Sequence, residues 1–262
     1  MADASQNKRS VERVSGDALR AWLRVPAGLS LPAWAQTRLE GSVLAELQAR
    51  EGTKLENVVF GIVDLETTGL AARRDRILEI GLVVQCGGRA LDHYATLIDV
   101  EVPIPRFITK LTGIDARDTA QAPSQADALV GFARVLRQQR VDVLVAHNAP
   151  FDRAFLEWAW TQHGHTSVLP PFLCSLRLAR RWVRARSYGL DVLAEQLRLP
   201  VRTRHRALGD AEITASLWQE LLQRGRLHGV HTLEALQGIA AVGDSRAGGR
   251  RVRVVDDRST IG

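Results

Sequence analysis

Cysteine is scarce in this 262-residue chain, which contains only Cys86 and Cys174. Two cysteines are too few for a disulfide-stabilised secreted scaffold, and they fit a reducing compartment. The polar N-terminus lacks the apolar core of a secretory signal. No run approaches the roughly 18 apolar residues that a membrane-spanning helix needs. We therefore expect a cytoplasmic protein with no membrane association.

Lysine is scarce as well: three of the 35 basic residues are lysines, and the rest are arginines. The net charge is +6 and the sequence pI is about 10.1. Arginine binds phosphate groups through its planar fork, so nucleic acid is a candidate partner. Arginine-biased codon usage explains the same composition equally well. Charge alone does not decide between these interpretations.

The length allows one large domain with appendages. Apolar periodicity predicts two helices between residues 10 and 50, separated by Pro26, Gly28 and Pro32. They form either a helical appendage or a partner-binding segment. We expect three parts: an N-terminal tail and helical extension over residues 1–56, a main domain over residues 57–225, and a C-terminal helix with a flexible tail over residues 226–262.

The sequence pattern of the main domain predicts an α/β fold. Three successive strands with short links indicate an antiparallel meander, and alternating helices and strands follow it. The expected architecture is a mixed sheet with helices packed against it. We predict strands over residues 57–64, 76–85, 91–98, 141–146 and 172–175, and helices over residues 124–139, 151–163, 176–186, 190–197, 207–223 and 232–241.

The first predicted strand carries two acids, Asp64 and Glu66, immediately after a β-branched and aromatic run. Residues i and i+2 of a strand point to the same face, so the two carboxylates lie side by side. Burying two like charges is unfavourable unless a cation lies between them. A solvated turn explains a lone pair of this kind, so the metal hypothesis requires further ligands.

A second candidate group follows the fourth predicted strand. Asp152 falls in the first turn of a helix, where an acid also complements the helix dipole. Ligand sites form at strand ends in open α/β sheets, so Asp152 reaches Asp64 and Glu66 if strands one and four are parallel neighbours. Asn148 adds a donor and an acceptor at the same edge, and we interpret His147 as structural.

The third group, His205 and Asp210, lies at the entry to the helix predicted over residues 207–223. Asp210 belongs to the first turn of that helix, and His205 to the loop before it. A base on a loop suits a group that must reach over metal-bound water. Glu212 faces elsewhere on the helix, and we expect it to be solvated. We interpret Glu79, inside the second strand, as a structural or rim residue and not as a ligand.

These three groups together resemble the DEDDh exonucleases, the family of the proofreading epsilon subunit of bacterial DNA polymerase III, ribonuclease T and oligoribonuclease. The resemblance covers roughly residues 57–225 and implies a ribonuclease H-like fold with a five-stranded mixed sheet. It is carried by Asp64-x-Glu66-Thr-Thr-Gly, His147-Asn148-x-x-Phe151-Asp152 and His205-x-x-x-x-Asp210, in that order, with Leu111-Thr112-Gly113-Ile114 between the first two.

The resemblance also implies roles for these residues. Four carboxylates would bind two Mg²⁺ ions, with Mn²⁺ able to substitute, and His205 would be the general base. The implied reaction is 3′–5′ exonucleolytic hydrolysis that releases nucleoside 5′-monophosphates from DNA 3′ ends, in proofreading or repair. RNA 3′-end trimming and a non-catalytic polymerase-associated module remain alternatives. The four implied metal ligands are Asp64, Glu66, Asp152 and Asp210.

Substrate contacts are expected next to the acids. Backbone N–H groups after the first strand can approach a terminal nucleotide, and Leu70 and Phe151 can flank its base; turn and core roles explain these residues equally well. The partners we expect are nucleic-acid 3′ ends, single-stranded DNA first and RNA second, and a DNA polymerase. The predicted substrate-binding residues are Thr67, Thr68, Gly69, Leu70, Asn148 and Phe151.

Overall fold

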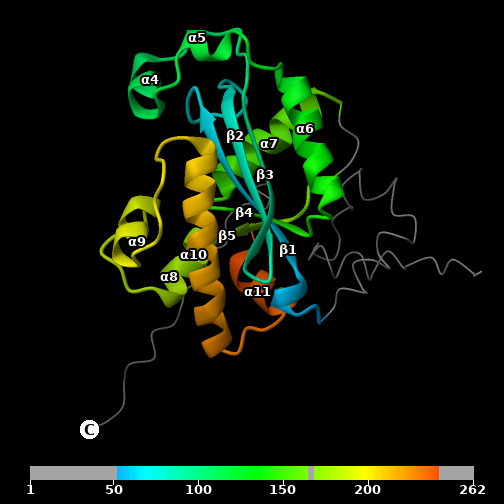
Figure 1. Ribbon diagram of the computed structural model, residues 1–262, viewed down its shortest axis with the longest axis vertical. Helices are drawn as coiled ribbons and strands as arrows, with labels where there is room; N and C mark the ends of the chain where they lie inside the picture. The colour runs from blue at the N-terminus through cyan, green and yellow to red at the C-terminus, as the bar shows by residue number, and fades with distance from the viewer. Residues whose placement is uncertain (1–51, 165–167, 242–262) are drawn as a thin grey trace, which may run out of the picture.

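The computed structural model describes residues 52–164 and 168–241. The helices predicted between residues 10 and 50 and most of the predicted C-terminal tail lie outside the described residues. Within them, a five-stranded sheet forms the centre of the molecule, in the order β3-β2-β1-β4-β5 (Figure 1). Its strands are β1 (Val59–Thr67), β2 (Ile77–Cys86), β3 (Arg89–Leu97), β4 (Val143–Ala146) and β5 (Phe172–Cys174).

The sheet is mixed. β1, β2 and β3 form the expected antiparallel meander, whereas β4 runs parallel to β1 and β5 parallel to β4. The five-stranded α/β fold is therefore confirmed. The predicted end of β1 was wrong, because the strand continues past residue 64 to Thr67. Asp64 and Glu66 are thus strand residues, and Glu66 lies opposite Glu79 of β2.

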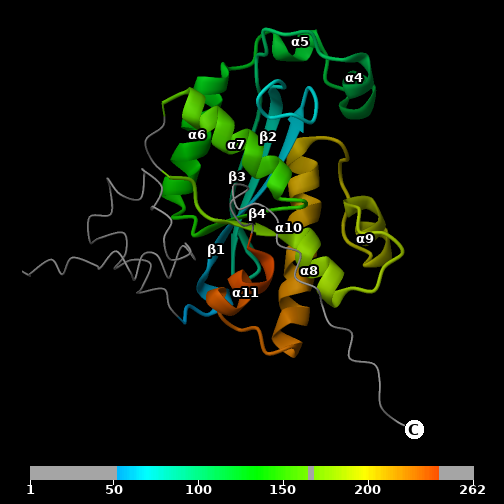
Figure 2. The same ribbon diagram turned by 180° about the vertical axis from the view of Figure 1, so that it is seen from behind.

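Helices cover both faces of the sheet, as the two opposite views show (Figures 1 and 2). Helices α6 and α7 pack on one face, and α8, α10 and α11 pack on the other. The described helices are η1 (Leu55–Asn57, a 3₁₀ turn), α4 (Arg106–Thr112), α5 (Ala116–Thr119), α6 (Gln125–Gln138), α7 (Pro150–Gln162), α8 (Ser175–Trp182), α9 (Leu190–Gln196), α10 (Ala207–Leu227) and α11 (Leu233–Ala240).

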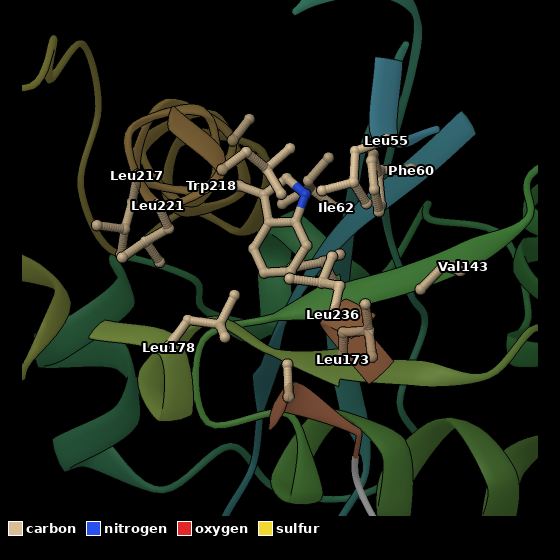
Figure 3. Packing of buried hydrophobic residues seen from close by; sticks show 14 of the residues in the cluster. Leu55, Phe60, Ile62, Val143, Leu173, Leu178, Leu217, Trp218, Leu221 and Leu236 are labelled. Atoms are coloured by element: carbon tan, nitrogen blue, oxygen red, sulfur yellow. The ribbon is translucent and has the colours of Figure 1, made fainter. Parts of the chain in front are cut away.

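Alternation along β1 divides the core between the two faces. Phe60 and Ile62 point toward α8, α10 and α11, whereas Val63 and Leu65 point toward α6 and α7. On the first face the ring of Trp218 packs edge-on against Phe60, with 5.4 Å between the ring centroids (Figure 3). Asp64 and Glu66 continue this first face, so they point toward α10.

Several predicted helix ends were wrong. The helix expected over residues 176–186 ends at Trp182, while the helix expected to stop at residue 223 continues to Leu227. The short helices α4 and α5 were not predicted. α10 crosses the domain boundary proposed at residue 225, and that boundary remains a prediction. No helix in the described ranges is both long and apolar enough to cross a membrane.

Candidate metal centre

Three carboxylates converge where β1 meets the start of α10. Asp64 and Glu66 come from one face of β1, and Asp210 comes from the first turn of α10. One oxygen of each carboxylate lies within 4.8 Å of the other two. Asp64 and Glu66 are partly buried and Asp210 is buried. Hard oxygen ligands at this separation match the donor set of a divalent cation such as Mg²⁺ or Mn²⁺.

Asp152 lies beside this cluster, in the first turn of α7 directly after β4. β4 is the parallel neighbour of β1, with Val145 opposite Ile62, which is the arrangement that the sequence argument required. Asp152 is 3% exposed, and its charge contributes to raising the pKa of Asp64. Three elements separated along the chain therefore bring four acids together.

Burial and mutual repulsion raise the pKa values of the clustered carboxyl groups. Burial, then the charges of Asp152 and Asp210, hold the pKa of Asp64 well above its ordinary value. Burial also raises the pKa of Asp152 well above its ordinary value. The pKa of Glu66 rises to about 7, mainly through burial and then through repulsion by Asp210 and Glu79. A bound cation removes this repulsion, so the donor set fits a metal.

One member of the cluster has a basic partner. Arg204 lies with its Nε 3.1 Å from Oδ1 of Asp210, and its guanidinium also pairs with Asp191 of α9. Burial raises the pKa of Asp210, and the Arg204 charge opposes this rise. The sequence analysis missed Arg204, because nothing in the spacing of these residues shows that the loop before α10 meets α9.

His205 lies next to the cluster with an unusual backbone. Its φ of 55° is in the left-handed region, and its N–H donates to Oδ2 of Asp210 at 3.3 Å. A positive φ in a residue with a bulky side chain is uncommon and is a feature of constrained sites. His205 is partly buried, so the loop presents it at the edge of the acidic cluster.

The other histidine of the motif is engaged elsewhere. Nε2 of His147 donates to the carbonyl of Tyr188 at 2.9 Å, and Nδ1 lies 2.9 Å from Oγ of Ser175. Burial lowers the pKa of His147, which favours the neutral ring. With both ring nitrogens engaged, His147 joins β4 to α8 and to the loop before α9, as expected for a structural residue.

The turn after β1 uses most of its own polar groups. Oγ1 of Thr67 donates to the Gly69 carbonyl at 2.6 Å. The N–H of Thr68 donates to the Arg76 carbonyl, and Oγ1 of Thr68 accepts the N–H of Arg76, each at 2.9 Å. A Cβ on Gly69 would lie 2.5 Å from the Asp75 carboxylate, which explains the glycine. The N–H of Thr68 is therefore not free for a nucleotide, whereas Leu70 is 87% exposed.

The two remaining predicted substrate residues lie at the start of α7. Asn148 is exposed and has a φ of 67°, a left-handed conformation that asparagine tolerates. The Phe151 ring is partly buried and packs against Phe155, with 4.9 Å between centroids. Two cavities of about 240 and 220 Å³ elsewhere in the described residues contain none of the clustered acids in their linings.

The RNase_T exonuclease family matches residues 62–218, which include all four acids and His205. The chain belongs to this family of DEDDh-type exonucleases. It therefore carries an exonuclease domain.

Curated relatives of this chain are much longer proteins. A protein of Mycobacterium tuberculosis, named a candidate bifunctional exonuclease/endonuclease, is 36% identical over 226 residues, which are 81% of this chain and 35% of the relative. A PolC-type DNA polymerase III of Caldanaerobacter subterraneus is 35% identical over 181 residues, 69% of this chain and 13% of the polymerase. The chain thus spans about a third or less of these relatives.

Solved structures have the same fold. Exonuclease X, in complex with 5′ overhanging duplex DNA, superposes with a TM-score of 0.55 at 26% identity, over 69% of this chain and 98% of that one. The nuclease domain of 3′hExo, described as a DEDDh family member bound to rAMP, gives a TM-score of 0.56 at 16% identity, over 66% of this chain and 96% of that one. The second likeness concerns the fold alone.

Proposed function

We propose that this chain is a divalent-metal-dependent 3′–5′ exonuclease that releases nucleoside 5′-monophosphates from DNA 3′ ends. The observation that supports it is the convergence of Asp64, Glu66 and Asp210 within 4.8 Å, with Asp152 beside them. DNA is proposed as the substrate because the relatives include PolC-type DNA polymerases, and Exonuclease X was solved with DNA. We place the catalytic domain at residues 57–225.

The carboxylates are the proposed metal ligands. Asp64 would bridge two ions, with Glu66 and Asp210 completing one site and Asp152 holding the other. Two bound Mg²⁺ or Mn²⁺ ions supply a pair of Lewis acids for in-line displacement at the terminal phosphodiester. The four acids would hold the ions, and the burial of Asp152 and Asp210, with the partial burial of Asp64 and Glu66, limits the access of water to the ligand oxygens.

His205 is the proposed general base. A neutral imidazole accepts the proton of the attacking water at a ring nitrogen. The support is its place on the loop held against Asp210, next to the cluster. Leu70, Asn148 and Phe151 lie on the segments that follow β1 and β4, and we propose that they contact the terminal nucleotide. The turn at Thr67, Thr68 and Gly69 would add contacts through groups other than the Thr68 N–H, which is bound to Arg76.

A time course on labelled oligonucleotides tests the proposal. Matched single-stranded DNA and RNA oligomers, labelled at either the 3′ or the 5′ end, are incubated with Mg²⁺, Mn²⁺ or EDTA. We expect a 5′-labelled DNA ladder that shortens progressively, immediate release of labelled mononucleotide from the 3′ end, and no reaction in EDTA. A 5′-first or EDTA-insensitive reaction contradicts the proposal.

RNA is the second candidate substrate. A structural neighbour is described as a 3′-exonuclease that recognises a histone mRNA stem-loop, and another holds rAMP. The acids and His205 do not distinguish the sugars, because discrimination depends on contacts around the 2′ position. Robust trimming of the RNA oligomer without trimming of DNA would transfer the proposal to RNA. Association with a DNA polymerase is proposed only from the PolC relatives.

A further inference from the structure

A fifth carboxylate lies beside the four acids. Glu79 of β2 is directly opposite Glu66 in the antiparallel register, and it is 4% exposed. Like charges directly opposite each other on neighbouring strands destabilise a sheet, and a buried carboxylate needs a partner. The role of Glu79 at this site therefore depends on which group compensates its buried charge.

The partner is Arg206, which is 127 positions away along the chain. Its Nε lies 3.2 and 3.1 Å from the two Glu79 oxygens, and its Nη2 lies 2.8 Å from Oε1. Such a two-pronged contact restricts both side chains more strongly than a single charge–charge contact. The Arg206 charge opposes the repulsion that the Glu79 carboxylate exerts on Glu66.

Glu79 also holds the first turn of α10. Its Oε2 accepts the N–H of Ala207 at 2.9 Å, and α10 has no side-chain cap of its own. The first N–H groups of a helix need partners from outside the helix. A Cβ added to Gly81 would lie 2.2 Å from the Ala207 backbone, so the two backbones are in direct contact here.

His205 immediately precedes this clamped segment. Its own N–H is bound by Asp210, and the next residue, Arg206, is bound by Glu79. The left-handed conformation of His205, at a φ of 55°, is therefore held from both sides. Such a conformation persists only where its surroundings enforce it.

We infer that Glu79 and Arg206 are positioning residues that aim His205 at the reacting phosphodiester. The inference rests on the proposed role of His205 as general base. Lysine at position 206 keeps the charge but cannot bond both carboxylate oxygens in the same plane. Arg206→Lys therefore separates the geometric contribution of the pair from its electrostatic one.

The experiment compares Arg206→Lys with a matched control, Arg224→Lys. Arg224 also pairs with a glutamate, with its Nε and Nη2 at 2.8 and 2.7 Å from Oε1 of Glu220, but it lies along α10 roughly 27 Å from residue 206. We expect kcat to fall about 10-fold in Arg206→Lys, with KM changed less than about 2-fold, because lost orientation acts on the chemical step. Glu79→Gln should reduce kcat similarly, and Arg224→Lys should leave it unchanged.

Repetition in the His205→Ala background tests whether the pair acts through His205. If it does, Arg206→Lys lowers the residual rate of His205→Ala by less than about 2-fold, because no base remains to be aimed. Melting curves followed by circular dichroism verify that each variant is folded. The imidazole signals of His205 in NMR spectra should shift in Arg206→Lys and not in Arg224→Lys.

Three results overturn the inference. An equal loss in both backgrounds would mean that the pair acts on the metal ligands or on folding, and no loss in either would mean that it has no role. A rise in KM that depends on salt, with kcat unchanged, would instead make Arg206 a phosphate contact. If His205→Ala alone keeps the full rate, the proposed general base is wrong, which is a separate failure.

Discussion

β1 and α10 contact each other at two places, one apolar and one acidic, and the two contacts have opposite effects on the stability of the fold. In the apolar contact, near the start of β1, Phe60 and Trp218 pack edge to face, and both are at most 1% exposed (Figure 3). Six residues further along β1, Glu66 lies close to Asp210 within a cluster of like charges. The first contact stabilises the fold, whereas the second opposes it through burial and repulsion of the acids.

The difference shows how the molecule holds repelling groups together. Aromatic pairs contribute about 0.5–1.5 kcal/mol beyond the area they bury, and the apolar contact continues into Ile62, Leu217 and Leu221. Because the same strand and helix carry both contacts, the apolar half determines where the acidic half lies. Substitutions in the two halves should therefore change activity and stability in opposite ways.

The largest expected effect is the loss of activity in Asp64→Asn. If Asp64 bridges two ions, removing its charge weakens both sites, and the nuclease rate should fall roughly 10³-fold or more. The melting temperature in EDTA should stay equal or rise, because a repelling charge is removed. Initial rates with Mg²⁺ and circular dichroism melts measure both. Glu212→Gln, two residues after Asp210, is the control and should keep its rate.

Trp218→Ala should give the reverse pattern. Truncating a fully buried tryptophan leaves a cavity and destabilises the fold by about 3–5 kcal/mol. In a domain of this size, that lowers Tm by roughly 6–20 °C. Below the transition, the rate per folded molecule should stay within a few-fold of wild type. A 10³-fold loss of rate in well-folded Trp218→Ala would contradict the division between the two halves.

The acidic half should also make stability depend on pH. The pKa of Glu66 rises from an ordinary value of 4.5 to about 7, so the unfolded chain loses this proton first. In EDTA, Tm should therefore fall as the pH rises from about 5 to about 8, and Mg²⁺ should restore it most at the upper end. The decline should be smaller in Glu66→Gln. An equal decline in both proteins would show that other groups cause it.

The smallest expected effect concerns His147. His147→Ala removes the donor to the Tyr188 carbonyl and leaves Ser175 Oγ with the Ala146 carbonyl at 3.4 Å, which costs about 1–3 kcal/mol in stability. Since neither ring nitrogen is directed at the acids, kcat should fall less than about 10-fold. Urea unfolding and rate measurements at a temperature where the variant is folded separate the two quantities. A loss of rate as large as that of Asp64→Asn would place His147 in the reaction.

Local pattern predicted much of the fold. Alternation and β-branched runs indicated all five strands, and the apolar period indicated the long helices α6, α7 and α10. Element ends were less predictable: β1 extends to Thr67 because β2 offers pairing partners, and α8 stops at Trp182 although the arginine-rich sequence continues. The short helices α4 and α5 carry too few residues for a periodic signal.

The candidate acids could be found from the sequence because their type, order and place after strands are local properties. Their partners could not. Glu79 and Arg206 are 127 residues apart, and neither stands out by itself: one is a charge in an apolar strand, the other one of many arginines. Arg204 is similar, since its contact with Asp191 depends on how the α9 segment returns to α10.

The amino-acid sequence by itself determined the family, the order of the elements and the identity of the acids, because these follow from residue type and spacing along a strand or a helix turn. Only the tertiary structure decided that Asp64, Glu66 and Asp210 come within 4.8 Å of one another, and that Glu79 lies against the start of α10. The reason is physical: side-chain contacts across a sheet depend on register and on helix docking, and the packed core around Phe60 and Trp218 determines both.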